Sequence, residues 1–175
     1  MHDNSLSELM LTHYSSNQSV SLVSIPQIKA KSKPVGLWVS VDGEFDWPTW
    51  CKKEEFGDID KQNRFIVTLS SAARILHLKT PDEILTFSEK YLSKESHVNA
   101  IINSDIDWPI ISVKYHGILI SPYQWSLRHD KIVDWYYGWD CASGCIWDKE
   151  AILSIKIDNP VVESVKSLSR HQLEV

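Results

Sequence analysis

The sequence predicts a single-domain α+β protein, from its length and from the order of its apparent secondary-structure elements. A chain of 175 residues has the usual size of one domain and can bury a substantial core. Strand-like runs of β-branched and aromatic residues prevail in the first third of the chain. Helix and strand patterns then follow without the regular alternation of βαβ units, so we expect an α+β arrangement.

Six strands are predicted from short apolar runs that are bounded by turn-forming residues. They are expected at residues 9–15, 36–41, 64–70, 73–79, 117–121 and 151–157. A further apolar run at 20–28 is interrupted by Pro26, which cannot donate to a strand ladder, so we expect an edge strand or an ordered loop there. A surface tail or a short helix is expected beyond the last strand.

Three helices are predicted from N-capping signals. The segment Thr-Pro-Asp-Glu at 80–83 is a capping box with Pro at the first helical position, and an apolar stripe of helical period follows it to about Ser93. The tripeptide Asp-Trp-Pro occurs at 46–48 and again at 107–109, with Asp suited to the N-cap and Pro to the first turn. The corresponding short helices are expected over 47–56 and 107–115.

Composition and charge limit the classes of partner. A net charge of −5 argues against a large footprint for duplex nucleic acid, although Lys29, Lys31 and Lys33 form a local basic patch. The three cysteines have no framework spacing, so no disulfide scaffold is expected. The N-terminus lacks a cationic segment followed by an apolar run, and no stretch approaches about 18 apolar residues. We therefore expect no membrane helix and a reducing cytoplasmic location.

One predicted strand carries an aromatic ring and a hydroxyl group on the same face. In Gly36-Leu37-Trp38-Val39-Ser40, the alternation of a strand points Trp38 and Ser40 to one side. The glycine would let another chain or a ligand approach the backbone closely. This pair could hold a flat ring, and it is equally compatible with a buried Trp and a Ser at the strand end. The eight Trp and six Tyr of the chain, against four Phe, suit either arrangement.

This strand and the earlier segment His13-Tyr14-Ser15 together resemble the NAD-binding strands of a known family. In the ADP-ribosyltransferase fold of the diphtheria-toxin and poly-ADP-ribose-polymerase type, a first strand carries a His followed by a small or hydroxyl residue. A second strand carries Gly-aliphatic-aromatic-x-small, usually with Tyr at the aromatic position. The resemblance covers residues 9–15 and 33–41 of this chain.

The resemblance implies a role for each matching residue. His13 would contact the ribose of NAD, and the backbone beside it, at Tyr14 and Ser15, would grip the nicotinamide amide. Trp38 would stack on the nicotinamide ring, and its neighbours on the strand would flank it: Gly36, Leu37 and Ser40. Trp in place of Tyr keeps the stacking surface and removes the phenol hydroxyl.

The third element of that family, an acid on a later strand, is expected in the Trp-rich segment 135–147. Asp140 lies there between aromatic and small residues, where a carboxylate could bond a ribose hydroxyl or stabilise positive charge as nicotinamide leaves. Asp140 could instead cap a turn formed through Ser143 and Gly144. The competing acids are Glu150, just before the last strand, and Asp148.

Two alternative chemistries involve the cysteines. The spacing Cys141-x-x-x-Cys145 does not fit a zinc knuckle, and no paired ligands follow, so no metal site is expected. A cysteine nucleophile with a distant His and Asp has no local signature here, and buried Cys is a common core residue.

The resemblance implies an NAD-dependent ADP-ribosyltransferase in which NAD is the substrate and Asp140 and His13 are catalytic. It further implies two small, mostly antiparallel sheets that form a cleft, with flanking helices. The acceptor would be a protein side chain or a nucleic acid, and small domains of this family are often toxins or phage-encoded modifiers of a host. The alternative is a non-catalytic module whose aromatic cleft binds a nucleotide or a partner.

Overall fold

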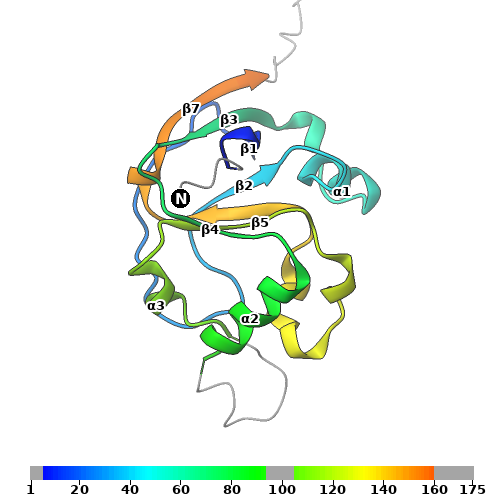
Figure 1. Cartoon of the computed structure of the whole chain (residues 1–175). Helices are drawn as coiled ribbons and strands as arrows, with labels where there is room; N and C mark the ends of the chain where they lie inside the picture. Colours follow the sequence, from blue (N-terminus) through cyan, green and yellow to red (C-terminus); the bar gives the residue numbers. More distant parts are fainter. Residues whose placement is uncertain (1–5, 94–104, 160–175) are drawn as a thin grey trace, which may run out of the picture.

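A computed structural model of the chain describes residues 6–93 and 105–159 (Figure 1). Its seven strands form one mixed sheet in the order β4-β5-β6-β2-β1-β3-β7. Only β4 and β5 are parallel, and all other neighbours are antiparallel. The strands are Leu11–Ser15 (β1), Leu37–Val41 (β2), Asn63–Leu69 (β3), Ile75–Leu78 (β4), Gly117–Ile120 (β5), Ser143–Ile146 (β6) and Ile152–Asn159 (β7).

The α+β class is confirmed, and so are the six predicted strands, within a few residues at their ends. Strand β6 was not predicted, because its sequence Ser-Gly-Cys-Ile carries little strand propensity. The run 20–28 forms no strand, although Ile25 donates its N–H to the carbonyl of Trp147. The tail expected beyond the last strand lies outside the described residues.

The three predicted helices begin at their expected caps. They are Trp47–Lys53 (α1), Pro81–Tyr91 (α2) and Trp108–Ser112 (α3). The described residues also contain short 3₁₀ segments, which are Leu6–Glu8 (η1), Ile59–Lys61 (η2), Trp125–Leu127 (η4), Lys131–Gly138 (η5) and Lys149–Ala151 (η6). The Asp46 carboxylate accepts the N–H of Thr49 at 2.9 Å, which caps α1. Helix α1 ends earlier than expected because Glu55, directly after the C-cap Glu54, adopts a positive φ angle that stops the helix.

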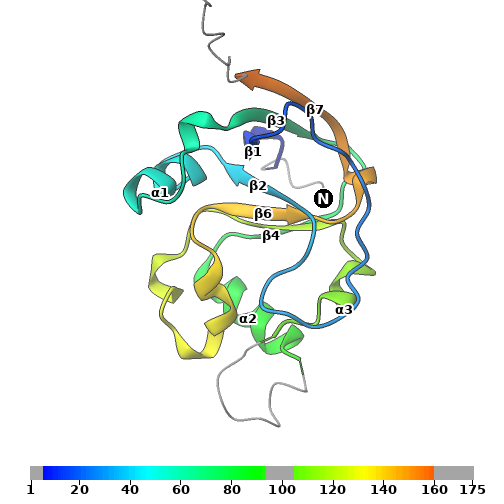
Figure 2. The same ribbon diagram turned by 180° about the vertical axis from the view of Figure 1, so that it is seen from behind.

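The expected pair of small sheets is wrong, since the strand ladder is continuous. Strand β1 pairs with both β2 and β3, and this joins the two halves into one sheet. The β1–β2 pairing nevertheless covers only two positions, Leu11 with Val41 and Thr12 with Ser40. Beyond them β1 continues beside β3 and β2 continues beside β6. The two strands thus diverge like a fork, with β3 and β7 on one side and β4, β5 and β6 on the other (Figures 1 and 2).

The main core lies between the β4–β5–β6 part of the sheet and the helical segments α2, α3 and η5, which Figure 1 shows below the strands. All residues of β5 and β6 are buried, so these strands are covered on both faces. Helix α2 buries the stripe that its periodicity predicted, and the largest fully buried side chains beside it are Trp108, Trp135, Tyr136 and Trp139. This half of the molecule is therefore the more densely packed side of the fork.

Candidate functional site

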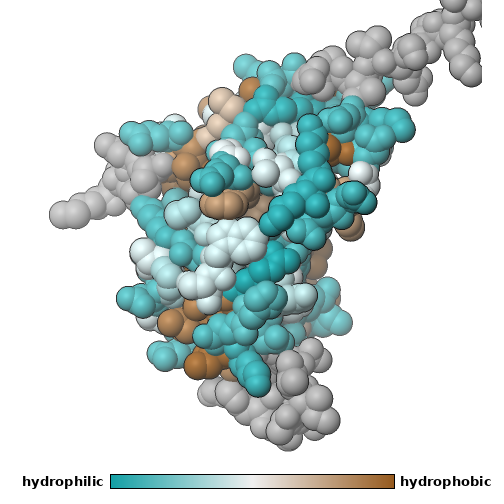
Figure 3. Space-filling model, turned by 90° about the vertical axis from the view of Figure 1, so that its right-hand side faces the viewer, coloured by the Kyte–Doolittle hydropathy of each residue, from teal (hydrophilic) through white to brown (hydrophobic). Residues whose placement is uncertain are grey.

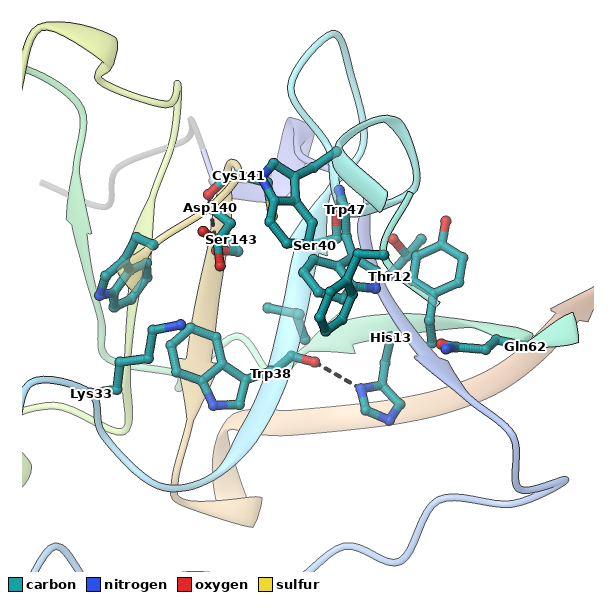
Figure 4. A pocket seen from close by; sticks show the side chains of 15 residues that line it. Thr12, His13, Lys33, Trp38, Ser40, Trp47, Gln62, Asp140, Cys141 and Ser143 are labelled. Carbon is teal, nitrogen blue, oxygen red and sulfur yellow. Dashed lines mark hydrogen bonds between the residues drawn. The ribbon is translucent and has the colours of Figure 1, made fainter. Parts of the chain in front are cut away.

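A cavity of about 490 Å³ lies where β1 and β2 diverge (Figure 4). Its walls come from β1, β2, α1 with the loop after it, and the segment that leads into β6. Five of the residues singled out from the sequence line it together: His13, Tyr14, Trp38, Ser40 and Asp140. Segments that are up to about 130 positions apart in the chain therefore meet here because β2 pairs with both β1 and β6.

His13 is fixed across the gap between the diverging strands. Its Nδ1 atom lies 2.8 Å from the carbonyl oxygen of Trp38. A carbonyl only accepts hydrogen bonds, so Nδ1 carries the proton, and the neutral ring is left with Nε2 as an acceptor. Burial lowers the pKa of His13 below 6.5, and the bond to Trp38 opposes this only in part. His13 therefore offers a neutral imidazole whose Nε2 can accept a hydrogen bond from a hydroxyl group.

Trp38 forms one aromatic wall of the cavity. Its ring is half-buried and packs edge-on against Trp139, with ring centroids 5.0 Å apart. The ammonium of Lys33 lies over the Trp38 ring, 5.1 Å from its centroid. Figure 4 shows the Lys33 side chain reaching over the ring on the side of Asp140. Trp38 is thus a cavity residue and not a member of the fully buried core.

A second aromatic wall comes from α1 and the loop after it. The rings of Trp47 and Trp50 stack with centroids 5.0 Å apart and planes inclined by 17°, and Phe56 packs against both. The hydroxyl oxygen of Ser40 accepts the N–H of Trp47 at 2.9 Å. Ser40 therefore fixes the start of α1 on β2, and this places the second wall beside the cavity.

Asp140 is the acid that lines the cavity. Its carboxylate is partly buried and lies 3.9 Å from the guanidinium of Arg128. Burial raises the pKa of Asp140, while Lys33 and Arg128 lower it and Glu54 raises it further. Ser143 and Gly144 lie in β6 and pair with β2, so they form no turn for Asp140 to cap. A carboxyl group with a raised pKa is suited to accept a proton during a reaction.

Three residues of the predicted NAD motif do not line the cavity. Ser15 is paired with Asn63 at the end of β1, and Leu37 faces the core, since alternation along β2 puts it opposite Trp38. A Cβ atom at Gly36 would lie 2.4 Å from the carbonyl oxygen of Ile146. Gly36 is therefore needed for the close approach of β2 to β6 and not for approach of a ligand.

The two competing acids lie at the opposite end of β6 from Asp140. Asp148 accepts the N–H of Glu150 at 3.0 Å and the hydroxyl of Ser24 at 3.1 Å, which lowers its pKa. Glu150 is exposed in η6. Neither side chain lines the cavity, so geometry distinguishes Asp140 from them.

The cysteines are buried thiols without disulfide bonds. Burial raises the pKa of Cys51 to about 11 and that of Cys141 to about 12, so both remain protonated near neutral pH. This argues against a thiolate nucleophile. Within residues 6–93 and 105–159, no group of three or more His, Cys, Asp or Glu side chains is arranged to hold a metal ion. In the same ranges no helix has the length and apolar character needed to cross a bilayer.

The second aromatic wall and Arg128 beside the acid were not predicted, and Lys33 was expected only as part of a basic patch. The spacing Trp47-x-x-Trp50 was an available signal, since residues three apart share a helix face. Aromatic residues also continue to the surface beyond the cavity, where Phe56, Trp125 and Tyr137 are exposed. Figure 3 shows the side of the molecule that carries α1, where residues of intermediate hydropathy lie between hydrophilic ones.

No family model matches the chain, and neither a curated protein nor a solved structure is similar to it.

Proposed function

We propose that this protein is an ADP-ribosyltransferase that uses NAD as its substrate. The observation that carries the proposal is the bond between the His13 ring and the Trp38 carbonyl, at the fork of the sheet and in the same cavity as Asp140. The cavity therefore combines a hydrogen-bond acceptor for a ribose hydroxyl, a flat surface for a ring, and a carboxylate.

The dimensions and chemistry of the cavity support this substrate. Its volume of about 490 Å³ is typical of small-molecule sites, which enclose roughly 300–1,000 Å³. The nicotinamide ring would lie on Trp38, and the attached ribose would donate a hydroxyl to Nε2 of His13. Tyr14 lies beside His13 on the cavity wall, where burial raises the pKa of its phenol and keeps it a neutral hydrogen-bond donor.

In the proposed reaction the bond between ribose C1′ and the nicotinamide nitrogen breaks. The nicotinamide leaves with the bonding electron pair as a neutral molecule, and positive charge develops on the ribose. Asp140 would stabilise that charge and accept the proton that the attacking nucleophile loses when it bonds to C1′. The nucleophile would be water or an acceptor group on a protein or a nucleic acid, and modification of a host molecule by a toxin or phage product is part of this proposal.

The test compares the acids at the two ends of β6. We expect Asp140→Asn to bind NAD, seen as quenching of Trp fluorescence, and to release nicotinamide about 100-fold more slowly than the unmodified protein. Glu150→Gln is the matched control and should retain full turnover. If Glu150→Gln loses turnover and Asp140→Asn does not, the choice of acid is wrong. If NAD is bound and never cleaved, the protein is a nucleotide-binding module instead of an enzyme.

A further inference from the structure

Lys33 places a positive charge over the ring that is proposed to hold the nicotinamide. Its ammonium lies 5.1 Å from the centroid of Trp38, and both side chains line the cavity. An ammonium over an indole face is held by the electrostatic attraction of the ring. Lys33 therefore covers a surface of Trp38 that a flat ligand needs.

The backbone at Gly138 is shaped to admit this lysine. A Cβ atom at position 138 would lie 2.9 Å from Cε of Lys33 and 3.7 Å from its Nζ atom. Cβ atoms in proteins do not approach other heavy atoms so closely, so any larger residue at Gly138 would displace the Lys33 side chain. The position of Lys33 thus depends on a glycine at the end of η5, two residues before Asp140.

Two cations act on the Asp140 carboxylate, Lys33 and Arg128. Arg128 lies 3.9 Å from that carboxylate and stays beside it when Lys33 turns to an anion. His13 is a neutral ring when its Nε2 acts as an acceptor. A dinucleotide brings a diphosphate with two negative charges, which a lysine binds as a point charge on a flexible stem.

We propose that Lys33 is a charge-selective gate, whose ammonium covers Trp38 in the free protein and turns to the diphosphate when the ring of a dinucleotide stacks on Trp38. The assignment of the ring to Trp38 rests on the proposed function. The nicotinamide of NAD is itself a cation, so this movement also relieves the repulsion between two like charges on the same indole. Lys33 would thereby favour ligands that carry both the ring and the diphosphate over ligands that carry the ring alone.

The test uses three probes and measures their dissociation constants by Trp fluorescence and calorimetry: NAD, ADP, and the 1-methylnicotinamide cation. We expect Lys33→Met to weaken the binding of NAD and ADP about tenfold, because a charge-assisted bond to phosphate is lost. The same variant should bind 1-methylnicotinamide more tightly than the unmodified protein does, because its ring no longer competes with the ammonium. A misfolded variant would not change the two affinities in opposite directions.

Two further variants separate the charge from its position. Lys33→Arg should keep ADP binding within a few-fold, since it retains the cation. Gly138→Ala keeps the cation and displaces it from Trp38, so it should tighten 1-methylnicotinamide binding and leave ADP binding within a few-fold of the unmodified protein. The inference is overturned if the unmodified protein does not bind ADP, if Lys33→Met leaves ADP binding unchanged, or if that variant weakens all three probes alike.

The outcomes also separate this inference from the proposed function. Binding of ADP that depends on Lys33, without cleavage of NAD, would support the anion site and refute the transferase. Cleavage of NAD with equal affinity in the unmodified protein and in Lys33→Met would support the transferase and refute the gate.

Discussion

The tryptophans of the core and those of the cavity differ in the partners of their indole N–H groups. In the core, Trp108, Trp135 and Trp147 donate to a backbone carbonyl, a serine hydroxyl and a second backbone carbonyl, at 2.9, 2.8 and 2.8 Å. Trp50 and Trp139 line the cavity, and their buried Nε1 atoms have no hydrogen-bond partner among the residues that the structure describes. The same residue type is therefore fully satisfied in one region and left with unused donors in the other.

This difference indicates what each region is built for. A buried donor without a partner costs roughly 1–3 kcal/mol, so folded proteins rarely keep one in a core. The core tryptophans satisfy this rule and add stability. The cavity lining keeps stacked rings and two buried indole donors without partners among the described residues, at a cost to stability.

The largest expected difference between the two regions is in stability. Trp135→Ala should lower the free energy of unfolding by about 3–5 kcal/mol, because it leaves a large void under α2 and removes the bond from the indole N–H to the Ser88 hydroxyl. Trp47→Ala, in the half-buried second wall, should lower it by about 1 kcal/mol and should weaken NAD binding instead. Urea unfolding and fluorescence titration measure the two effects. Equal loss of stability in both variants would contradict the division into core and cavity.

A smaller difference in the free energy of unfolding is expected from the indole N–H group alone. Trp108 and Trp139 are equally inaccessible, at 0% and 1% exposure, and only Trp108 has an acceptor. Replacement by Phe removes the same volume at both positions, so Trp108→Phe should cost about 1 kcal/mol more than Trp139→Phe through its lost hydrogen bond. Urea midpoints of the two variants, measured side by side, give the difference. A larger loss for Trp139→Phe would show that its N–H has an interaction that the static geometry does not reveal.

The fold was predictable where local chemistry decides it. The capping residues before α1, α2 and α3 and the apolar runs of six strands contain their own signals, and the structure has these elements where they were expected. Strand β6 has no such signal, because its small residues form a strand only between β2 and β5. Whether the strands form one sheet or two was equally hidden, since it depends on the two β1–β2 residue pairs.

The candidate site was predictable only in part. The pattern of a His and a later aromatic strand singled out His13 and Trp38, which the fold brings together. Lys33 was singled out as part of a local basic patch, and its place over Trp38 beside Gly138 comes from long-range packing. Gly36 shows the opposite case, in which a motif residue serves strand packing instead of ligand contact.

The smallest expected effect concerns pH and tests whether the fork of the sheet depends on a neutral His13. Burial lowers the pKa of His13 in the folded protein below its ordinary value of 6.5, so the unfolded chain binds the proton more readily. The stability that the neutral ring contributes is complete above about pH 6.5 and is lost as the pH falls through the lowered pKa. Urea midpoints should therefore decrease between pH 7.5 and pH 5.5, and His13→Asn should reduce that decrease.

The matched control is His129→Asn, since His129 is exposed and does not line the cavity. Protonation of the folded protein also removes the Nε2 acceptor of His13, so NAD binding should weaken as the pH falls through the lowered pKa of His13. In His13→Asn, binding should be weak at every pH and lose its pH dependence. If His13→Asn and the unmodified protein lose stability equally on acidification, burial of a neutral His13 is not the source of the pH dependence.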